Sequence, residues 1–111
     1  MKYTDRQRLQ KIYAYAVQLR TAIQEMNITR EALLDNVRLQ WLVTTPLYNI
    51  GEHVYCLSDD YKKAHDTVPW ALIAGMRHRL VHDYDDTNWN LVVKILFEDI
   101  PALIEQLESL K

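Results

Sequence analysis

Apolar residues recur at alternating steps of three and four along most of this 111-residue chain. That spacing places side chains on one face of an α-helix. The chain also has only 2 glycines and 3 prolines. β-Hairpins depend on residues that tolerate a positive φ, so this composition argues against an architecture of strands and tight turns. The pattern therefore predicts an all-α fold.

The N-terminal half of the chain is predicted to form two long helices. The first covers about residues 5–26, where Thr4 and Gln7 have the spacing of a capping box. The second runs from about residue 30 to residue 57. Pro46 falls inside its apolar pattern, so either this helix kinks or a new helix begins there. The kink is the favoured interpretation, because the apolar rhythm continues past the proline.

The C-terminal half is predicted to form a short element and two further long helices. Residues 58–66 are expected to be a short helix or a turn. Pro69 suits the first turn of the next helix, whose apolar pattern breaks after Tyr84. The last helix is expected over residues 89–110, with a bend at Pro101. Together these elements predict an antiparallel four-helix bundle with an additional short helix.

Size, charge and cysteine content limit the classes of protein. The length suits one domain covering residues 1–111. A net charge of −2 argues against non-specific binding of duplexes, although it permits a small basic cleft. The single cysteine, Cys56, cannot form an internal disulfide or a paired-thiolate metal cluster. Because no signal peptide or membrane span is recognisable, we expect a cytoplasmic protein that does not bind membranes.

The polar tract MRHRLVHDY, residues 76–84, raises the question of function. On a regular helix, Arg77 and Tyr84 share one face, whereas His78 and His82 share another. Arg77 and His82 are five residues apart and therefore lie about 140° from one another around the axis. They can cooperate only if the helix loosens near His82, or if a second chain brings the groups together.

These side chains suit the cleavage of RNA. A histidine moves protons near neutral pH, since its reference pKa is about 6.5. An arginine can hold a phosphate and stabilise developing negative charge. A ribose 2′-hydroxyl could then attack the adjacent phosphorus while His82 moves a proton and Arg77 holds the phosphate oxygens, without a metal ion. The alternative is an ordinary basic helix end, which the helix dipole also favours.

The order Arg77, four residues, His82, one residue, Tyr84 resembles the signature of the HEPN superfamily and, more narrowly, of the HepT toxin family. The resemblance extends over NIGEHVYCLS (49–58), VPWALIAGMRHRLVHDYDD (68–86), and Trp89 with the apolar helix that follows. It implies a small HEPN-like helical homodimer in which Arg77 and His82 of both chains line one cleft. Such an arrangement would remove the conflict between their directions on one helix.

The same resemblance implies an activity and its control. Members of the family resemble metal-independent endoribonucleases that act as toxins, which would make Arg77 and His82 catalytic. The partner would be an MntA-like nucleotidyltransferase antitoxin that attaches AMP to Tyr84. This modification would place bulk and negative charge in a basic cleft and repel RNA. No cofactor is implied.

Two acidic residues are candidate supporting groups for this site. Glu52 could pair with Arg77 or Arg79 and orient it, or it could be an exposed helix glutamate. Asp83 could raise the pKa of His82. A solvated loop acid is the favoured interpretation of Asp83.

Two histidines depart from the family pattern. His78 stands where the family more often has asparagine, and it is kept as a possible supporting residue. His53 stands where alanine is usual, and a structural role is favoured. The pairs His78/His82 and Asp83/Asp85 suggest a metal site, but nothing else has ligand spacing, so no metal is expected.

Two other classes of function stay open. The chain could be a non-catalytic helical module that binds a nucleotidyltransferase and helps to present its substrate, or a purely structural helical protein. The tryptophans Trp41, Trp70 and Trp89 lie on apolar stripes. They are expected to anchor the core or a dimer interface.

Overall fold

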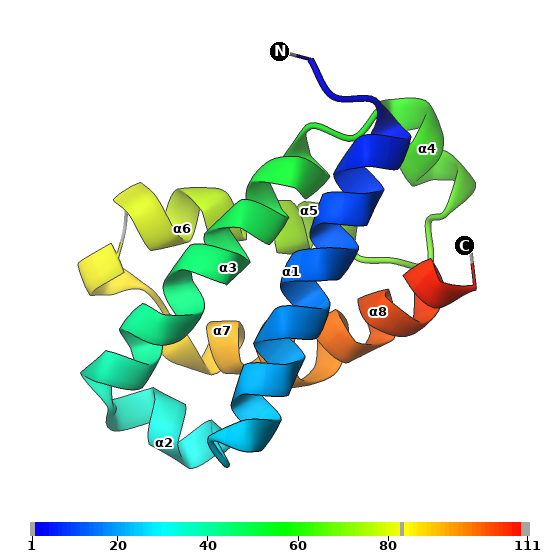
Figure 1. The fold of residues 1–111 in the computed structure, drawn as a ribbon. Coiled ribbons are helices and arrows are strands. Elements are labelled where there is room, and N and C mark those ends of the chain that lie inside the picture. The colour runs from blue at the N-terminus through cyan, green and yellow to red at the C-terminus, as the bar shows by residue number, and fades with distance from the viewer. Residues whose placement is uncertain (1, 83, 110–111) are drawn as a thin grey trace.

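The computed structural model describes residues 2–82 and 84–109, and every regular element within them is a helix or helical turn (Figure 1). The elements are α1 (Asp5–Glu25), α2 (Arg30–Asp35), α3 (Val37–Tyr55), α4 (Asp59–Ala64), α5 (Trp70–Ala74), α6 (Met76–His82), the 3₁₀ turn η1 (Tyr84–Asp86), α7 (Trp89–Lys94), the π-helical turn η2 (Ile95–Asp99) and α8 (Ile100–Glu108). The predicted all-α fold is confirmed.

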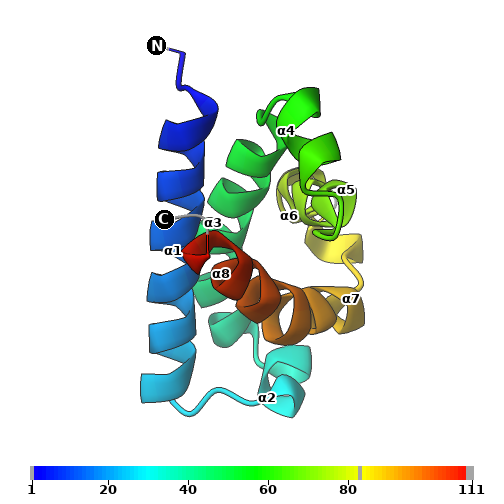
Figure 2. The same cartoon turned by 90° about the vertical axis from the view of Figure 1, so that its right-hand side faces the viewer.

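Helix α3 has neighbours on two sides. It lies antiparallel to α1 and also contacts α5 and α6 (Figure 1). Helix α8 packs against α1, and α2 packs against α7. In Figure 2, α8 lies in front of α3 and closes this side of the bundle. The fully buried side chains include Ile12, Leu33, Leu47, Ile50, Met76, Ile100 and Leu103. Each such aliphatic side chain stabilises the fold by about 1.5–3 kcal/mol, so this core fixes α6 against α3.

Polar side chains fix the start of α1 as the capping pattern predicts. Thr4 Oγ1 accepts a hydrogen bond from the Gln7 amide at 3.1 Å, and Gln7 Oε1 accepts one from the Thr4 amide at 2.9 Å. Asp5 in the first turn then accepts hydrogen bonds from the amide and the hydroxyl of Ser58, the N-cap of α4. The start of α1 is thereby connected to the segment that follows α3.

The second helix was predicted as one continuous element, and this is wrong, because the helix is interrupted at Asn36. The Asn36 backbone is extended, and its side chain accepts hydrogen bonds from the amides of Arg38 and Leu39. An asparagine that caps a following helix in this way also ends the preceding one. Pro46 lies inside α3, which continues through it to Tyr55.

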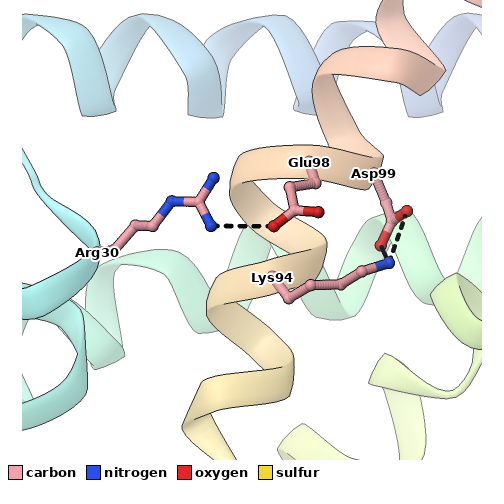
Figure 3. A network of polar contacts seen from close by, with 4 residues as sticks. All are labelled: Arg30, Lys94, Glu98 and Asp99. Atoms are coloured by element: carbon pink, nitrogen blue, oxygen red, sulfur yellow. Dashed lines mark hydrogen bonds and ion pairs between the residues drawn. The ribbon is translucent and has the colours of Figure 1, made fainter.

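Pro101 affects the chain one turn earlier than its own position. It stands in the first turn of α8 and has no amide hydrogen to donate to the preceding turn. The five residues before α8 form the π-helical turn η2, whose wider hydrogen-bond spacing accommodates that loss. Figure 3 shows two ion pairs at this junction, Arg30 with Glu98 at 3.0 Å and Lys94 with Asp99 at 2.9 Å. They join α2 to η2 and α7 to η2.

The helix expected after Pro69 consists of two consecutive segments. Gly75, itself in a helical conformation, separates α5 from α6. Helix α6 ends at His82, and the 3₁₀ turn η1 begins at Tyr84. The motif therefore occupies the end of a helix and the turn after it.

Candidate active site

Two α3 side chains hold Arg77, which lies on α6. Its Nε donates a hydrogen bond to Glu52 Oε2 at 2.9 Å, and both side chains are about one-third exposed. The guanidinium carbon lies 4.1 Å from the centre of the Tyr55 ring, which is cation–π geometry. Of the two arginines considered from the sequence, Arg77 and not Arg79 is therefore the partner of Glu52.

Close packing of α3 on α6 makes this contact possible. Gly51 precedes Glu52 and is buried where the two helices meet. A Cβ atom at this position would lie 2.9 Å from the backbone nitrogen of Arg77 and 3.1 Å from the carbonyl oxygen of Ile73. Only glycine allows the backbones to approach this closely. The Gly51–Glu52 pair thus places a carboxylate directly beside the arginine of the motif.

The electrostatics of this contact favour a fixed cation. The hydrogen bond with Glu52 raises the pKa of Arg77, partial burial opposes this, and the charge of Glu52 supports it. An arginine is charged at physiological pH in any case. The contribution of Glu52 is therefore to orient the guanidinium.

The two histidines of the motif lie together on the exposed side of α6. The ring centres of His78 and His82 are 5.1 Å apart, with the ring planes tilted by 40°. Helix α6 is regular as far as His82, its last residue. The angle of about 140° between Arg77 and His82 therefore persists in the described chain. The backbone of one copy therefore starts these two side chains in diverging directions.

The remaining candidates of the motif are only partly described. Asp83 lies outside the described residues. The backbone of Tyr84 begins the turn η1, directly after the end of α6, and its side chain is not described. Neighbouring Arg79 accepts a hydrogen bond from the Thr87 hydroxyl through its carbonyl, and its Nη1 is buried without a hydrogen-bond partner among the described residues.

Sequence reasoning missed Tyr55 as part of this site. The signal was its spacing, since Trp41, Tyr48 and Tyr55 follow one another at steps of seven on α3, and Glu52 shares their face. Trp41 is 60% exposed, so it is not a core anchor, whereas Trp70 is buried. Val81 on α6 is also 52% exposed. An apolar surface therefore borders the Arg77 contact.

The other features of the described residues do not suggest a different catalytic site. A hollow of about 870 Å³ lies between α1, α4 and α8, but Leu9, Tyr13, Tyr61 and Leu107 make its lining largely apolar and no motif residue reaches it. The described residues hold no group of three or more His, Cys, Asp or Glu that could bind a metal ion. None of the described helices has the length and apolarity needed to cross a membrane.

Comparisons with known proteins agree with the motif. Residues 9–110 match the family described as Ribonuclease HepT-like. The chain is 36% identical over 61 residues to a candidate RNase of Caldanaerobacter subterraneus subsp. tengcongensis, covering 55% of this chain and 54% of that protein. It is 33% identical over 81 residues to the probable ribonuclease HepT of Thermococcus cleftensis, covering 73% and 74%.

A candidate RNase of Methanocaldococcus jannaschii is 28% identical over 82 residues, covering 74% of this chain and 75% of that protein. The chain thus spans about half the length of the Caldanaerobacter relative and about three quarters of the other two. No solved structure gives a significant match. Since the family match runs from α1 to α8 and one HepT relative aligns over most of its length, the chain belongs to the HepT-like ribonuclease family.

Proposed function

We propose that this chain is a metal-independent endoribonuclease and the toxin of a toxin–antitoxin pair. The observation that carries the proposal is the Glu52–Arg77 contact within a motif that also supplies His82. Glu52 engages Arg77 through Nε, so the two terminal nitrogens can form a fork for phosphate oxygens. Membership of a ribonuclease family supports RNA as the source of that phosphate.

The proposed reaction is an intramolecular transesterification within the RNA strand. The ribose 2′-oxygen bonds to the adjacent phosphorus as the bond from phosphorus to the 5′-oxygen breaks, which leaves a 2′,3′-cyclic phosphate and a 5′-hydroxyl end. One imidazole accepts the 2′ proton, and a second returns a proton to the departing 5′-oxygen. Arg77 stabilises the negative charge that develops on the non-bridging phosphate oxygens. Two copies of His82, one from each chain of a dimer, supply the base and the acid.

A homodimer also accounts for the exposed apolar surface beside Arg77. The exposed Trp41 and Tyr55 and the partly buried Tyr48 form a stripe along α3, and Val81 lies on the adjoining α6. A two-fold interface uses the same patch of both chains, so this stripe can cover its own copy. Such pairing sets the two motifs near one another, and the groups that diverge on one helix can meet across the interface.

Tyr84 is the proposed point of control. A nucleotidyltransferase antitoxin of the MntA type would attach AMP to its phenol, next to the end of α6. The added phosphate repels RNA from the basic groups of the motif. Mass spectrometry after co-expression with an MntA-type nucleotidyltransferase should find one or more AMP adducts on wild-type protein and none on Tyr84→Phe. Adducts that persist on the phenylalanine variant would contradict this assignment.

Cleavage assays on purified protein test the proposed activity. His82→Ala and Arg77→Ala should each lower the cleavage rate by about 100–10,000-fold, the range for a lost acid–base or electrostatic group. His65→Gln is the control, because His65 packs on Tyr61 and lies outside the motif. Circular dichroism should show all variants folded. Full cleavage by His82→Ala refutes the proposal, and intact RNA with wild type favours a non-catalytic module that docks on a nucleotidyltransferase.

A further inference from the structure

A second group of basic and aromatic side chains lies where α1 meets α3. Arg8 Nη1 is 3.2 Å from His53 Nδ1. The Tyr3 ring has the Lys11 ammonium 4.8 Å and the Arg8 guanidinium 5.4 Å from its centre, and it meets the His53 ring edge-on at 5.9 Å. We refer to Tyr3, Arg8, Lys11 and His53 as the α1–α3 cluster.

The cluster combines a neutral imidazole with two cations. A guanidinium can only donate, so His53 Nδ1 accepts and the proton of the ring lies on Nε2. Burial lowers the pKa of His53, and the charges of Arg8 and Lys11 lower it further. Among the described residues, no carboxylate lies within 4 Å of Arg8 or Lys11. The cluster therefore holds two cations that form no ion pair among the described residues, in a chain whose net charge is −2.

A surface hollow adjoins these groups. It measures about 400 Å³ and is lined by Tyr3, Gln7, Gln10, Lys11 and Ala14. Amide groups can hydrogen-bond the edges of unpaired bases, an aromatic ring can stack on a base, and ammonium and guanidinium groups bind phosphate. The lining chemistry thus fits single-stranded nucleic acid better than an apolar ligand.

The α1–α3 cluster is close to the candidate active site. Glu52 and His53 are neighbours on α3, and Glu52 bonds to Arg77 whereas His53 bonds to Arg8. Consecutive residues differ by about 100° around a helix that is ~10 Å across, so about one helix diameter separates the two groups. A strand lying over the outer surface of α3 can contact both.

We propose that the α1–α3 cluster binds the single-stranded RNA segment next to the phosphate that is cleaved. Lys11 and Arg8 bind its backbone phosphates, and Tyr3 and Gln10 contact a base. This inference rests on the proposed ribonuclease function, because it takes the RNA at the motif as its starting point. The cluster then contributes to affinity and to the choice of cleavage position, and Arg77 and His82 perform the chemistry.

Binding of an RNA that cannot be cleaved tests the inference apart from catalysis. The probe is a fluorescent random-sequence single-stranded RNA with 2′-O-methyl riboses, which has no 2′-hydroxyl to attack. Wild type is compared with the double variant Arg8→Gln/Lys11→Gln and with Arg20→Gln/Lys63→Gln, which removes equal charge elsewhere. Affinity of the first double variant should fall about tenfold, and the slope of log K against log salt should shrink by about 1.4, or about 0.7 per lost phosphate contact.

Each outcome bears on the proposal. An affinity that is unchanged in the cluster variant, or lowered equally in the control variant, overturns it, as does an absence of RNA binding by wild type. An acidic protein partner for the cluster would produce that last result. If the double variant does not fold, Lys11→Glu alone provides the same test, because Lys11 lies over the Tyr3 ring without a hydrogen bond among the described residues. Cleavage of ordinary RNA by wild type is scored separately, so a failed nuclease proposal is recognised independently.

Discussion

At the scale of single residues, the proposed role of Arg77 in binding phosphate depends on how its planar guanidinium is oriented, because its charge is constant. Glu52 holds Nε at 2.9 Å, and Tyr55 lies against the guanidinium with 4.1 Å from Cζ to the ring centre. A bidentate phosphate contact needs the edge of the guanidinium that carries both terminal nitrogens to face the substrate. A carboxylate on one edge and an aromatic ring on one face restrict the rotations that would spoil this alignment. Glu52 is thus a positioning residue for the proposed reaction.

Glu52→Ala should lower the cleavage rate about tenfold or more, because a misplaced group can cost up to about 10²-fold in rate. Thermal stability should change little, since a partly exposed ion pair contributes about 0–1 kcal/mol. Glu52→Gln should restore part of the rate, as its amide oxygen can still accept from Nε. Cleavage rates and melting temperatures of the three proteins check this. Equal rates for wild type and Glu52→Ala would show that Arg77 needs no such support.

His53 should make stability depend on pH. Its pKa in the folded chain is lowered, by burial first and then by Arg8 and Lys11, with Glu52 opposing. The unfolded chain therefore takes up the proton first as the pH falls. This contribution to stability is complete above about pH 6.5 and declines as the pH falls from there towards the folded pKa. Between about pH 8 and about pH 5, the free energy of unfolding measured with urea should fall further for wild type than for His53→Gln. Identical losses would contradict the prediction.

At the scale of elements, local signals were readable from the sequence and contacts between helices were not. The capping pair Thr4 and Gln7 acts within one turn, so its spacing alone predicted the start of α1. Asn36 was overlooked because the apolar pattern continues across it, although its side chain caps α3. The π-helical turn before Pro101 was not predicted, since only a bend was expected there. The approach of α3 to α6 at Gly51 depends on tertiary packing, which periodicity does not report.

Gly51→Ala should destabilise the fold by about 1–3 kcal/mol, the usual cost of forcing an extra carbon into a packed contact. Its Cβ would press on the Arg77 backbone nitrogen at 2.9 Å and push α6 away from Glu52, so cleavage should fall as well. Gly75→Ala is the matched control. Its closest contact would be 3.3 Å, and its backbone is already helical, so the change should be clearly smaller. Chemical denaturation measures both variants. Equal stability of the two would contradict the packing argument.

At the scale of the whole molecule, the sequence predicted the fold class and the family, but it could not place the working groups relative to one another. The motif identified Arg77 and His82 as candidates, and the structure leaves them on different faces of α6. It also leaves Trp41 60% exposed where a core or interface anchor was expected. Both observations have one explanation if the functional unit contains two chains. A single-chain pattern carries little information about a surface that pairs with its own copy.

Trp41→Gln should therefore convert a dimer to a monomer and abolish cleavage together, although Trp41 carries no group that reacts with RNA. In a two-fold interface one substitution removes the aromatic anchor from both chains, so its effect on the dimerisation free energy is doubled. Such anchors often contribute about 2 kcal/mol or more each. Met26→Gln is the control, because Met26 is 53% exposed at the C-cap of α1 and is not part of the α3 stripe. Analytical ultracentrifugation and cleavage assays at matched concentrations provide the measurement. A monomeric wild type that cleaves RNA would show that one chain alone brings Arg77 and His82 together. A Trp41→Gln variant that stays dimeric and fully active would show that the stripe on α3 is not the interface that the reaction needs.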